Sequence, residues 1–224
     1  MNKKNIAYYK TIIFDCDGVL LDSNKVKSKA FYEVALPFGE ELANELVDYH
    51  KEYGGVSRNQ KFHYFLEHIL NKPDKDISLD DLLINYGSLV INSLIKSNKC
   101  DGLDFLRAHS HKAKWIVVSG GNEEEIKKVF KQKDMLSYFD GGIFGSPKSK
   151  DNIFSDLIEN QVIQFPAIYL GDSKYDHQVA TKYLIDFLFI HGWTEFKNWE
   201  TYCREHSVSS IEKVAELANW HQGL

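Results

Sequence analysis

Two aspartates two residues apart, Asp15 and Asp17, are the residues of this chain whose types and spacing most directly suggest chemistry. They follow the apolar run 11–14, which is β-branched and aromatic and ends abruptly at charge, as a buried strand does. Because strand side chains alternate with a period of two, both carboxylates project to one side and repel each other unless a cation lies between them. Gly18 then allows a sharp turn and a close approach to a ligand. The segment predicts a magnesium-dependent phosphate site, or alternatively a plain turn in which Asp15 caps a helix.

Three later segments place polar side chains at the ends of apolar runs or before a helical stretch. They contain Ser119 followed by Gly120, the lysines Lys148 and Lys150, and the aspartates Asp172 and Asp176. In open α/β sheets, ligands bind outside the carboxyl ends of the strands. We therefore expect these side chains to meet Asp15 and Asp17 at one edge of a sheet.

Together the four segments resemble, in order and spacing, the four motifs of the haloacid dehalogenase (HAD) superfamily, and the match runs from residue 11 to about residue 190. The resemblance implies an α/β fold: a doubly wound, parallel-sheet, Rossmann-like core with an inserted α-helical cap. It places the core domain in residues 1–21 and 100–224 and the cap domain in residues 22–99. The motifs look like those of the branch that contains phosphatases and β-phosphoglucomutase-like enzymes.

The resemblance also implies a role for each motif residue. Asp15 would be the nucleophile that forms an aspartyl-phosphate, and Asp17 the general acid and then the general base. Asp15, Asp172 and the main-chain carbonyl of Asp17 would hold Mg²⁺, which prefers oxygen ligands. Asp176 would be either a further metal ligand or a residue that holds the motif loop. The phosphoryl group would be bound by Ser119, the amides near Gly120, and a lysine, for which Lys150 is preferred over Lys148 because it directly precedes a helix start.

Residues 24–98 carry four apolar stripes with helical spacing, separated by breaks that contain proline or glycine, which predicts a four-helix cap. Within it, Gly-Val-Ser-Arg at 55–58 resembles the cap segment of β-phosphoglucomutase-type members, in which the arginine holds a substrate phosphate. Ser57 is explained as a helix N-cap, whereas Arg58 is a candidate for binding substrate. The lysines Lys25, Lys27, Lys29 and Lys61 are also present, but nothing in the sequence singles one out as a Schiff-base lysine for phosphonate hydrolysis.

After residue 99 the pattern alternates between strand and helix, which predicts a parallel βαβ series. We expect strands at 114–118, 142–144, 167–171 and 187–190. Asp101 is expected to be the N-cap of a helix that runs to about His109. Asn122 is expected to be the N-cap of a second helix, which begins directly after it. The tail from Ser210 to Leu217 starts like a further capped helix.

Composition limits the function classes. The chain has 224 residues and a formal net charge of −5, so it offers no basic footprint for nucleic acid. Its three scattered cysteines suit a reduced, cytoplasmic compartment. No apolar run approaches the ~20 residues that span a bilayer. The expected partner is a small phosphorylated substrate, with no nucleic acid and no membrane, and the oligomeric state is not readable from the sequence.

These observations predict a magnesium-dependent phosphatase that hydrolyses a small phosphorylated metabolite, a sugar or polyol phosphate, through an aspartyl-phosphate. Two alternatives stay open. A β-phosphoglucomutase-like sugar phosphomutase is favoured by Arg58 but not by the loop after Ser119. A catalytically silent binding protein would keep the same motifs without turnover. Dehalogenation is disfavoured because dehalogenating members lack the second aspartate, which stands here as Asp17.

Overall fold

Six parallel strands form one sheet in the computed structural model, which describes residues 5–70 and 77–221. The strands are β1 (Thr11–Phe14), β2 (Lys114–Asn122), β3 (Ile143–Ser146), β4 (Ala167–Gly171), β5 (Asp186–Ile190) and β6 (Ser210–Ile211). Their order in the sheet is β3-β2-β1-β4-β5-β6, so the chain winds outward in both directions from β1 and β4. In a doubly wound sheet of this kind, the crevice for a ligand lies where the strand order reverses, outside the carboxyl ends of β1 and β4.

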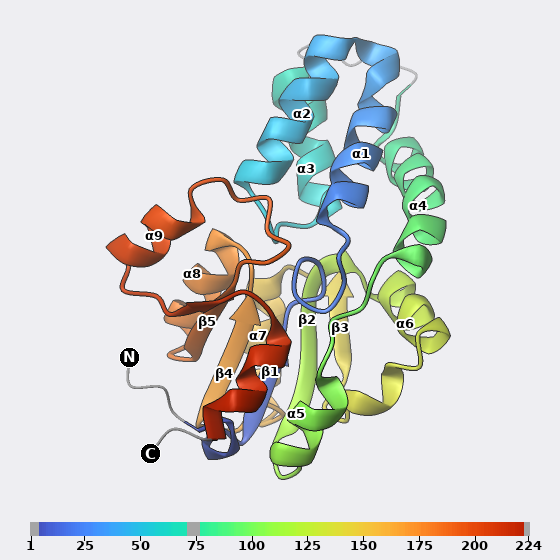
Figure 1. The fold of residues 1–224 in the computed structure, drawn as a ribbon. Coiled ribbons are helices and arrows are strands. Elements are labelled where there is room, and N and C mark those ends of the chain that lie inside the picture. The colour runs from blue at the N-terminus through green and yellow to red at the C-terminus, as the bar shows by residue number, and fades with distance from the viewer. Residues whose placement is uncertain (1–4, 71–76, 222–224) are drawn as a thin grey trace.

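Helices cover both faces of the sheet (Figure 1), and each face carries its own apolar cluster. In β1, Ile12 and Phe14 join one apolar cluster, whereas Ile13 joins the other, because successive strand side chains point to opposite faces. The first cluster includes residues of α5 (Leu103–His109), α6 (Glu123–Gln132) and the 3₁₀ helix η5 (Val214–His221). The second includes residues of α7 (Lys150–Glu159), α8 (Lys174–Lys182) and α9 (Trp199–Glu205). The expected doubly wound α/β fold is therefore confirmed.

A helical layer stands above the carboxyl ends of the strands (Figure 1). It consists of α1 (Asn24–Ala35), α2 (Glu40–Glu52), α3 (Arg58–Tyr64), which continues into the π-helical turn η3 (Phe65–Ile69), and α4 (Leu79–Lys96). Aromatic side chains pack its centre, with the ring of Phe31 4.5 Å from that of Tyr86 and 5.2 Å from that of Phe62. We refer to this helical layer as the cap.

The chain enters and leaves the cap at two adjacent points. Leu21 and Lys99 form an antiparallel bridge, and the amide of Cys100 donates to the carbonyl of Leu20 at 2.9 Å. The expected domain boundaries at 21/22 and 99/100 lie beside this bridge, and the division into two domains stays a prediction.

Two local predictions are wrong. The tail from Ser210 does not begin a helix, because Ser210 and Ile211 form β6 and pair with β5, and a 3₁₀ helix follows only from Val214. Ile211 is buried by that pairing, so the sheet edge overrides the local capping pattern. Asp101 does not cap α5; the N-cap is Gly102, in the left-handed conformation with φ 82°.

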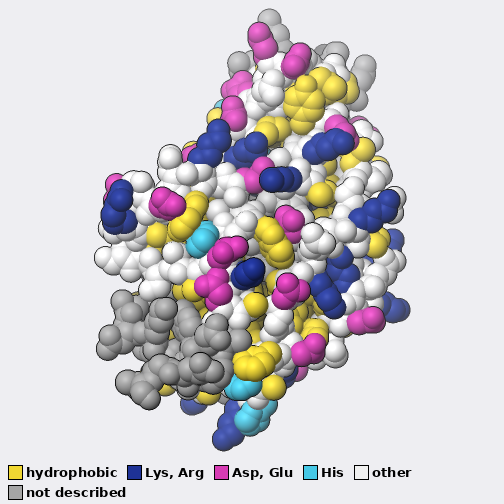
Figure 2. Space-filling model, in the orientation of Figure 1, with side chains coloured by type: hydrophobic (Ala, Val, Ile, Leu, Met, Phe, Trp, Pro, Cys, Tyr) yellow, Lys and Arg dark blue, Asp and Glu magenta, His cyan; other side chains and the backbone are white. Residues whose placement is uncertain are grey.

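The surface carries mixed charge. Figure 2 shows basic and acidic side chains interspersed over the visible face. Several of these charges are paired, as Lys174 is with Glu52 at 2.6 Å and Lys182 with Asp151 at 2.7 Å. Among the described residues, we find no helix with the length and apolar character that crossing a membrane requires.

Candidate active site

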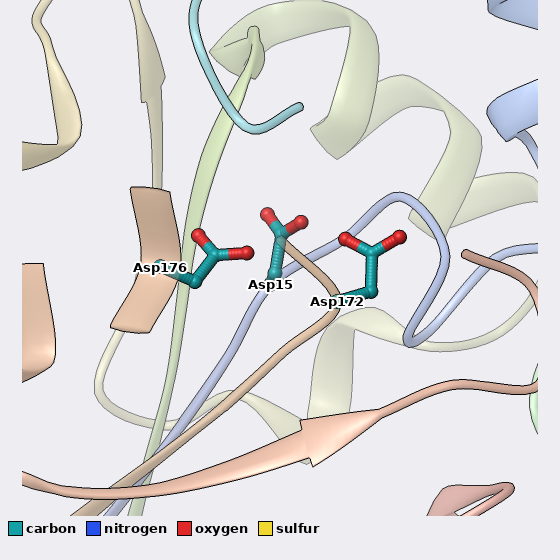
Figure 3. A group of neighbouring side chains, drawn as sticks. All are labelled: Asp15, Asp172 and Asp176. Atoms are coloured by element: carbon teal, nitrogen blue, oxygen red, sulfur yellow. The ribbon is translucent and has the colours of Figure 1, made fainter. Parts of the chain in front are cut away.

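Three buried aspartates meet at the carboxyl ends of β1 and β4. Asp15 follows β1, Asp172 follows β4, and Asp176 lies in the first turn of α8. Each offers one carboxylate oxygen, and these oxygens lie within 4.8 Å of one another. Figure 3 shows Asp15 between the other two. The neighbours β1 and β4 pair Phe14 with Leu170, so the residues that follow the two strands are brought side by side by the register.

The turn after Asp15 wraps around Asp172. Gly18 has φ 79°, and a Cβ at this position would lie 2.1 Å from Asp172 Oδ2. Asn24, the first residue of α1, donates from Nδ2 to the same oxygen at 2.7 Å and to the carbonyl of Trp193 at 3.0 Å. Glycine is therefore required at position 18 both by the backbone conformation and by the space that Asp172 occupies.

Lys150 is the lysine that the fold brings to Asp15. It is the first residue of α7 and is fully buried, and its Nζ lies 2.8 Å from Asp15 Oδ1. It also forms an ion pair with Asp176 and donates to the Tyr169 hydroxyl at 3.0 Å. Lys148, the alternative considered in the sequence, is exposed and pairs with Asp156 on the outer side of α7.

Asp176 is held by three donors. Its Oδ1 accepts from Lys150 and from the hydroxyl of Tyr169 at 2.8 Å, and its Oδ2 accepts from Ser173 at 2.7 Å. Because both carboxylate oxygens of Asp176 already have protein partners, the geometry favours a role in holding the motif loop over a role as a further metal ligand. Tyr169 was missed by the sequence analysis, since a tyrosine within an apolar strand gives no signal of which buried group it contacts.

Asp17 lies on the cap side of the cluster. Its Oδ1 accepts from Ser23 Oγ at 2.6 Å, its Oδ2 pairs with Lys27, and Ser119 Oγ lies 3.5 Å from Oδ2. Although burial opposes ionisation, the ammonium of Lys27 and the donor hydroxyl of Ser23 hold the pKa of Asp17 below its ordinary value. Nothing in the sequence distinguished Lys27 from its neighbours in the cap. The signal that could have found it is its place with Asn24 on one face of the first turns of α1.

The cap lies directly against the loop that follows Ser119. Ser119 is buried, and its Oγ accepts from the amide of Gly121 at 3.0 Å. A Cβ at Gly120 would lie 2.3 Å from the carbonyl oxygen of Gly55, and a Cβ at Gly55 would lie 2.7 Å from Ser173 Oγ. The two glycines therefore let the cap loop and the core loops meet at backbone distance.

A cavity of about 60 Å³ is enclosed between these loops. Asp15, Asp17 and Asp172 line it, together with helical residues of the cap that include Lys27, His50 and Lys61. A cavity of this size holds a few water molecules, since each needs roughly 10–15 Å³ by the same measure.

Arg58 lines the cavity, but its guanidinium is engaged. Nη1 and Nη2 donate to the two carboxylate oxygens of Glu125 at 3.0 and 2.8 Å, and the group lies 5.3 Å above the ring centre of Tyr86. Glu125 belongs to α6 of the sheet layer, so this bidentate pair joins the cap to the core. The structure does not present Arg58 as a free anion-binding group.

The carboxylates of the acidic cluster outnumber the positive charges beside them. Burial, followed by the charges of Asp176 and Asp17, raises the pKa of Asp15 to about 7 against the pull of Lys150. Burial, followed by the charges of Asp15 and Asp176, raises the pKa of Asp172 well above its ordinary value. Although burial opposes the charge, the carboxylates of Asp15 and Asp176 raise the pKa of Lys150, so its ammonium stays charged. One positive charge thus faces several carboxylates.

The residues present fit a magnesium ion. Asp15 Oδ1 is buried and, apart from its ion pair with Lys150, has no partner among the described residues. The donors are carboxylate oxygens alone, the ligand type that suits Mg²⁺. Both oxygens of Asp176 accept from protein donors, so Asp15 and Asp172 are the cluster members that could hold the ion.

Comparison with known proteins agrees with this geometry. A family model described as haloacid dehalogenase-like hydrolase matches residues 9–181. A phosphorylated carbohydrates phosphatase of Thermotoga maritima is 23% identical over 197 residues, which cover 84% of this chain and 88% of that protein. Among solved structures, a "predicted phosphatase" of Clostridium acetobutylicum superposes with TM-score 0.73 at 19% identity, covering 96% of this chain and 99% of its own. CbbY of Rhodobacter sphaeroides, solved with phosphate, gives TM-score 0.68 at 17% identity, covering 93% and 96%. These two structures share the fold.

Proposed function

The chain belongs to the haloacid dehalogenase-like hydrolase family and is an enzyme of the phosphatase type, and we propose that it hydrolyses small phosphorylated carbohydrates with Mg²⁺ through an aspartyl-phosphate on Asp15. The observation that carries the proposal is the setting of Asp15, a buried carboxylate at a strand end that lies 2.8 Å from Lys150 Nζ and lines the cavity between the core and the cap. The phosphorylated carbohydrates phosphatase of T. maritima supports sugar or polyol phosphates as the substrate class.

The side chains of the site divide the reaction between them. Asp15 would attack phosphorus in line, while Lys150 and Ser119 offset the charge on the phosphoryl oxygens. The leaving oxygen would take its proton from the Asp17–Lys27 pair, in which the two groups share a hydrogen bond. Asp17, held as a carboxylate by Lys27, is then in the form that can remove a proton from the water that hydrolyses the aspartyl-phosphate.

Asp15, Asp172 and the main-chain carbonyl of Asp17 would hold the metal ion. When bound, Mg²⁺ offsets the charge of these carboxylates and of the phosphoryl oxygens. Asp176 would act one step away from the ion: its partners Lys150, Tyr169 and Ser173 indicate that it positions Lys150.

Hydrolysis is favoured over the mutase alternative by the state of Arg58. A mutase of the type considered would use this arginine to hold the second phosphate, but both of its terminal nitrogens donate to Glu125. We also propose a cytoplasmic location, which is supported by the three free, buried cysteines.

Phosphate release tests the proposal. The purified protein is incubated with a panel of sugar and polyol phosphates, with Mg²⁺ or with a chelator, and we expect turnover that requires the metal and no bisphosphate primer. Borohydride reduction of acid-quenched enzyme should convert the phosphorylated residue 15 to homoserine, which mass spectrometry detects. Absence of turnover on every ester would indicate a silent binding protein, and an isomerised sugar phosphate without free phosphate would indicate a mutase.

A further inference from the structure

The cations that line the cavity differ in their partners. Four of them pair with a carboxylate: Lys27 with Asp17, Lys51 with Glu195, Arg58 with Glu125, and Lys174 with Glu52. The fifth, Lys61, has no carboxylate partner among the residues that the structure describes. It is also among the most deeply buried, with 2% of its surface exposed.

The contacts of Lys61 come from neutral groups. Its Nζ lies 2.7 Å from His50 Nδ1 and 3.4 Å from the carbonyl of the same residue, and 5.6 Å from the ring centre of Phe31. Burial, followed by the charge of Lys61, holds the pKa of His50 well below its ordinary value, so the ring is neutral and Nδ1 can accept from the amine. Burial and the ammonium of Lys27 also lower the pKa of Lys61 to about 7. A neutral imidazole orients Lys61 but supplies no counter-charge.

A lysine at this place is costly for the fold alone. Its helix α3 packs through Phe62 against Phe31 and Tyr86, and an apolar side chain of similar length at position 61 would fill the space without the penalty of a buried, uncompensated amine. The observation that accounts for a lysine is its position on the wall of the cavity that Asp15, Asp17 and Asp172 also line.

We propose that Lys61, oriented by His50, binds an oxyanion carried by the leaving alcohol of the substrate, either a carboxylate or a second phosphate. The inference rests on the proposed phosphatase function and narrows it. The transferred phosphoryl group lies at Asp15 on the core wall, and Lys61 meets the far end of the same molecule on the cap wall. Because Asp15 and Lys61 line the same small cavity, a short chain between the two anionic ends is sufficient to reach both. The substrate class is therefore phosphate monoesters of short hydroxy acids, or short bisphosphates.

Matched pairs of esters test this assignment. 3-Phosphoglycerate and glycerol 3-phosphate have the same carbon skeleton and differ in a carboxylate against a hydroxymethyl group. Propane-1,3-diol bisphosphate and 3-hydroxypropyl phosphate form the corresponding pair for a second phosphate. We expect kcat/KM for one dianionic member to exceed that of its partner by about 10- to 150-fold, the range for a hydrogen bond to a charged group. The pair that shows the preference identifies the oxyanion.

Substitution of Lys61 supplies the decisive comparison. Lys61→Met has similar length, and we expect it to reduce the preference to less than about 3-fold. The preference is a ratio measured within one variant, so a loss of folded protein cancels. Lys51→Met is the control, because it removes a cavity-lining cation that already has a carboxylate partner, and it should keep the preference.

The outcomes are distinguishable. An unchanged preference in Lys61→Met, an equal loss in Lys51→Met, or no preference in the wild-type protein overturns the assignment of Lys61. Turnover of 4-nitrophenyl phosphate without preference for either dianionic ester leaves the proposed phosphatase function standing while the inference fails. Absence of turnover on all five esters and on the panel of sugar and polyol phosphates overturns both.

Discussion

The two walls of the cavity carry opposite uncompensated charge. On the core wall, Asp15 and Asp172 are carboxylates that lack enough cations, and on the cap wall Lys61 is an amine that lacks an anion. Burial disfavours the charged form of each, so it raises the pKa of Asp15 and lowers that of Lys61, both to about 7. The core wall is thus suited to a metal ion and a phosphoryl group, and the cap wall to the rest of the substrate. Substitutions on the core wall should therefore change the rate of reaction, and substitutions on the cap wall should change the preference among substrates.

Substitution of the nucleophile should give the largest effect and tests whether the core wall performs the chemistry. Asp15→Asn preserves the shape of the side chain but removes its nucleophilicity, and we expect kcat to fall by at least ~1000-fold for every ester. Steady-state phosphate release measures the loss. Equal losses across substrates would agree with a core wall that performs chemistry only, whereas more than a tenth of wild-type turnover would contradict a covalent role for Asp15.

The stability of the metal-free protein should respond to pH in opposite directions on the two walls. Asp15 keeps its proton in the folded state up to about pH 7 but loses it near 3.8 when unfolded, so its contribution falls as pH rises between these values. Lys61 is neutral above about pH 7 when folded but protonated up to about 10.5 when unfolded, so its contribution rises over that range. Each change could reach about 4 kcal/mol.

Urea unfolding in the presence of a chelator, at a series of pH values, measures these contributions as differences between wild type and variant. The difference from Asp15→Asn should change below pH 7, and the difference from Lys61→Met should change above it. Added Mg²⁺ should reduce the first change and leave the second. A difference profile that is flat with pH for either variant would show that its group titrates alike in the folded and unfolded chain.

Asp172→Asn sharpens the comparison within the core wall. The substitution retains the hydrogen-bonding shape, removes one carboxylate from the cluster, and should weaken Mg²⁺ binding by ~100-fold. Because burial and neighbouring charges raise the pKa of Asp172, the metal-free variant should be at least as stable as the wild type. Calorimetric titration with Mg²⁺ and thermal unfolding of the metal-free protein are the measurements. Undiminished binding would exclude Asp172 as a ligand.

The smallest expected effect concerns the contact between the walls. Arg58 and Glu125 are partly buried and form a bidentate pair, so a double-mutant cycle with alanine should give a coupling free energy of about 1 kcal/mol in stability. Loss of the pair should raise KM several-fold for all esters alike, because it loosens the closed cap. A loss confined to bisphosphates in Arg58→Ala, but absent in Glu125→Ala, would instead assign Arg58 to the substrate.

The sequence predicted the strands of the core well because the apolar runs and the polar residues that end them are local signals. The run 11–14 is β1 with the expected bounds, and Asn122 caps α6 by accepting from the amide of Glu125 at 3.0 Å. The tail failed because β6 depends on an edge of the sheet that lies far away in the chain. Capping signals at Ser210 could not report that partner.

The same distinction between local signals and distant partners applies to the candidate site. Residues that directly follow strands or begin helices of the core, such as Asp15, Asp172 and Lys150, were identified from motifs and are brought together in the structure. Partners supplied by another helix were not predicted. The pairing of Arg58 with Glu125 and of Lys61 with His50 depends on how helix faces meet, and amphipathic periodicity shows which face is buried but not which residue it meets.

The bridge between Leu21 and Lys99 has a consequence for how such enzymes can be altered. The two crossings are joined by backbone hydrogen bonds, from the amide of Asp22 to the carbonyl of Asn98 and from that of Cys100 to Leu20, each at 2.9 Å. An insertion whose ends already lie together can be replaced by one of different length without disturbing the host, as domain insertions are at closely spaced termini. We expect the segment between these crossings to behave as an exchangeable module, so that grafting another cap here would transfer a new selectivity onto an unchanged sheet.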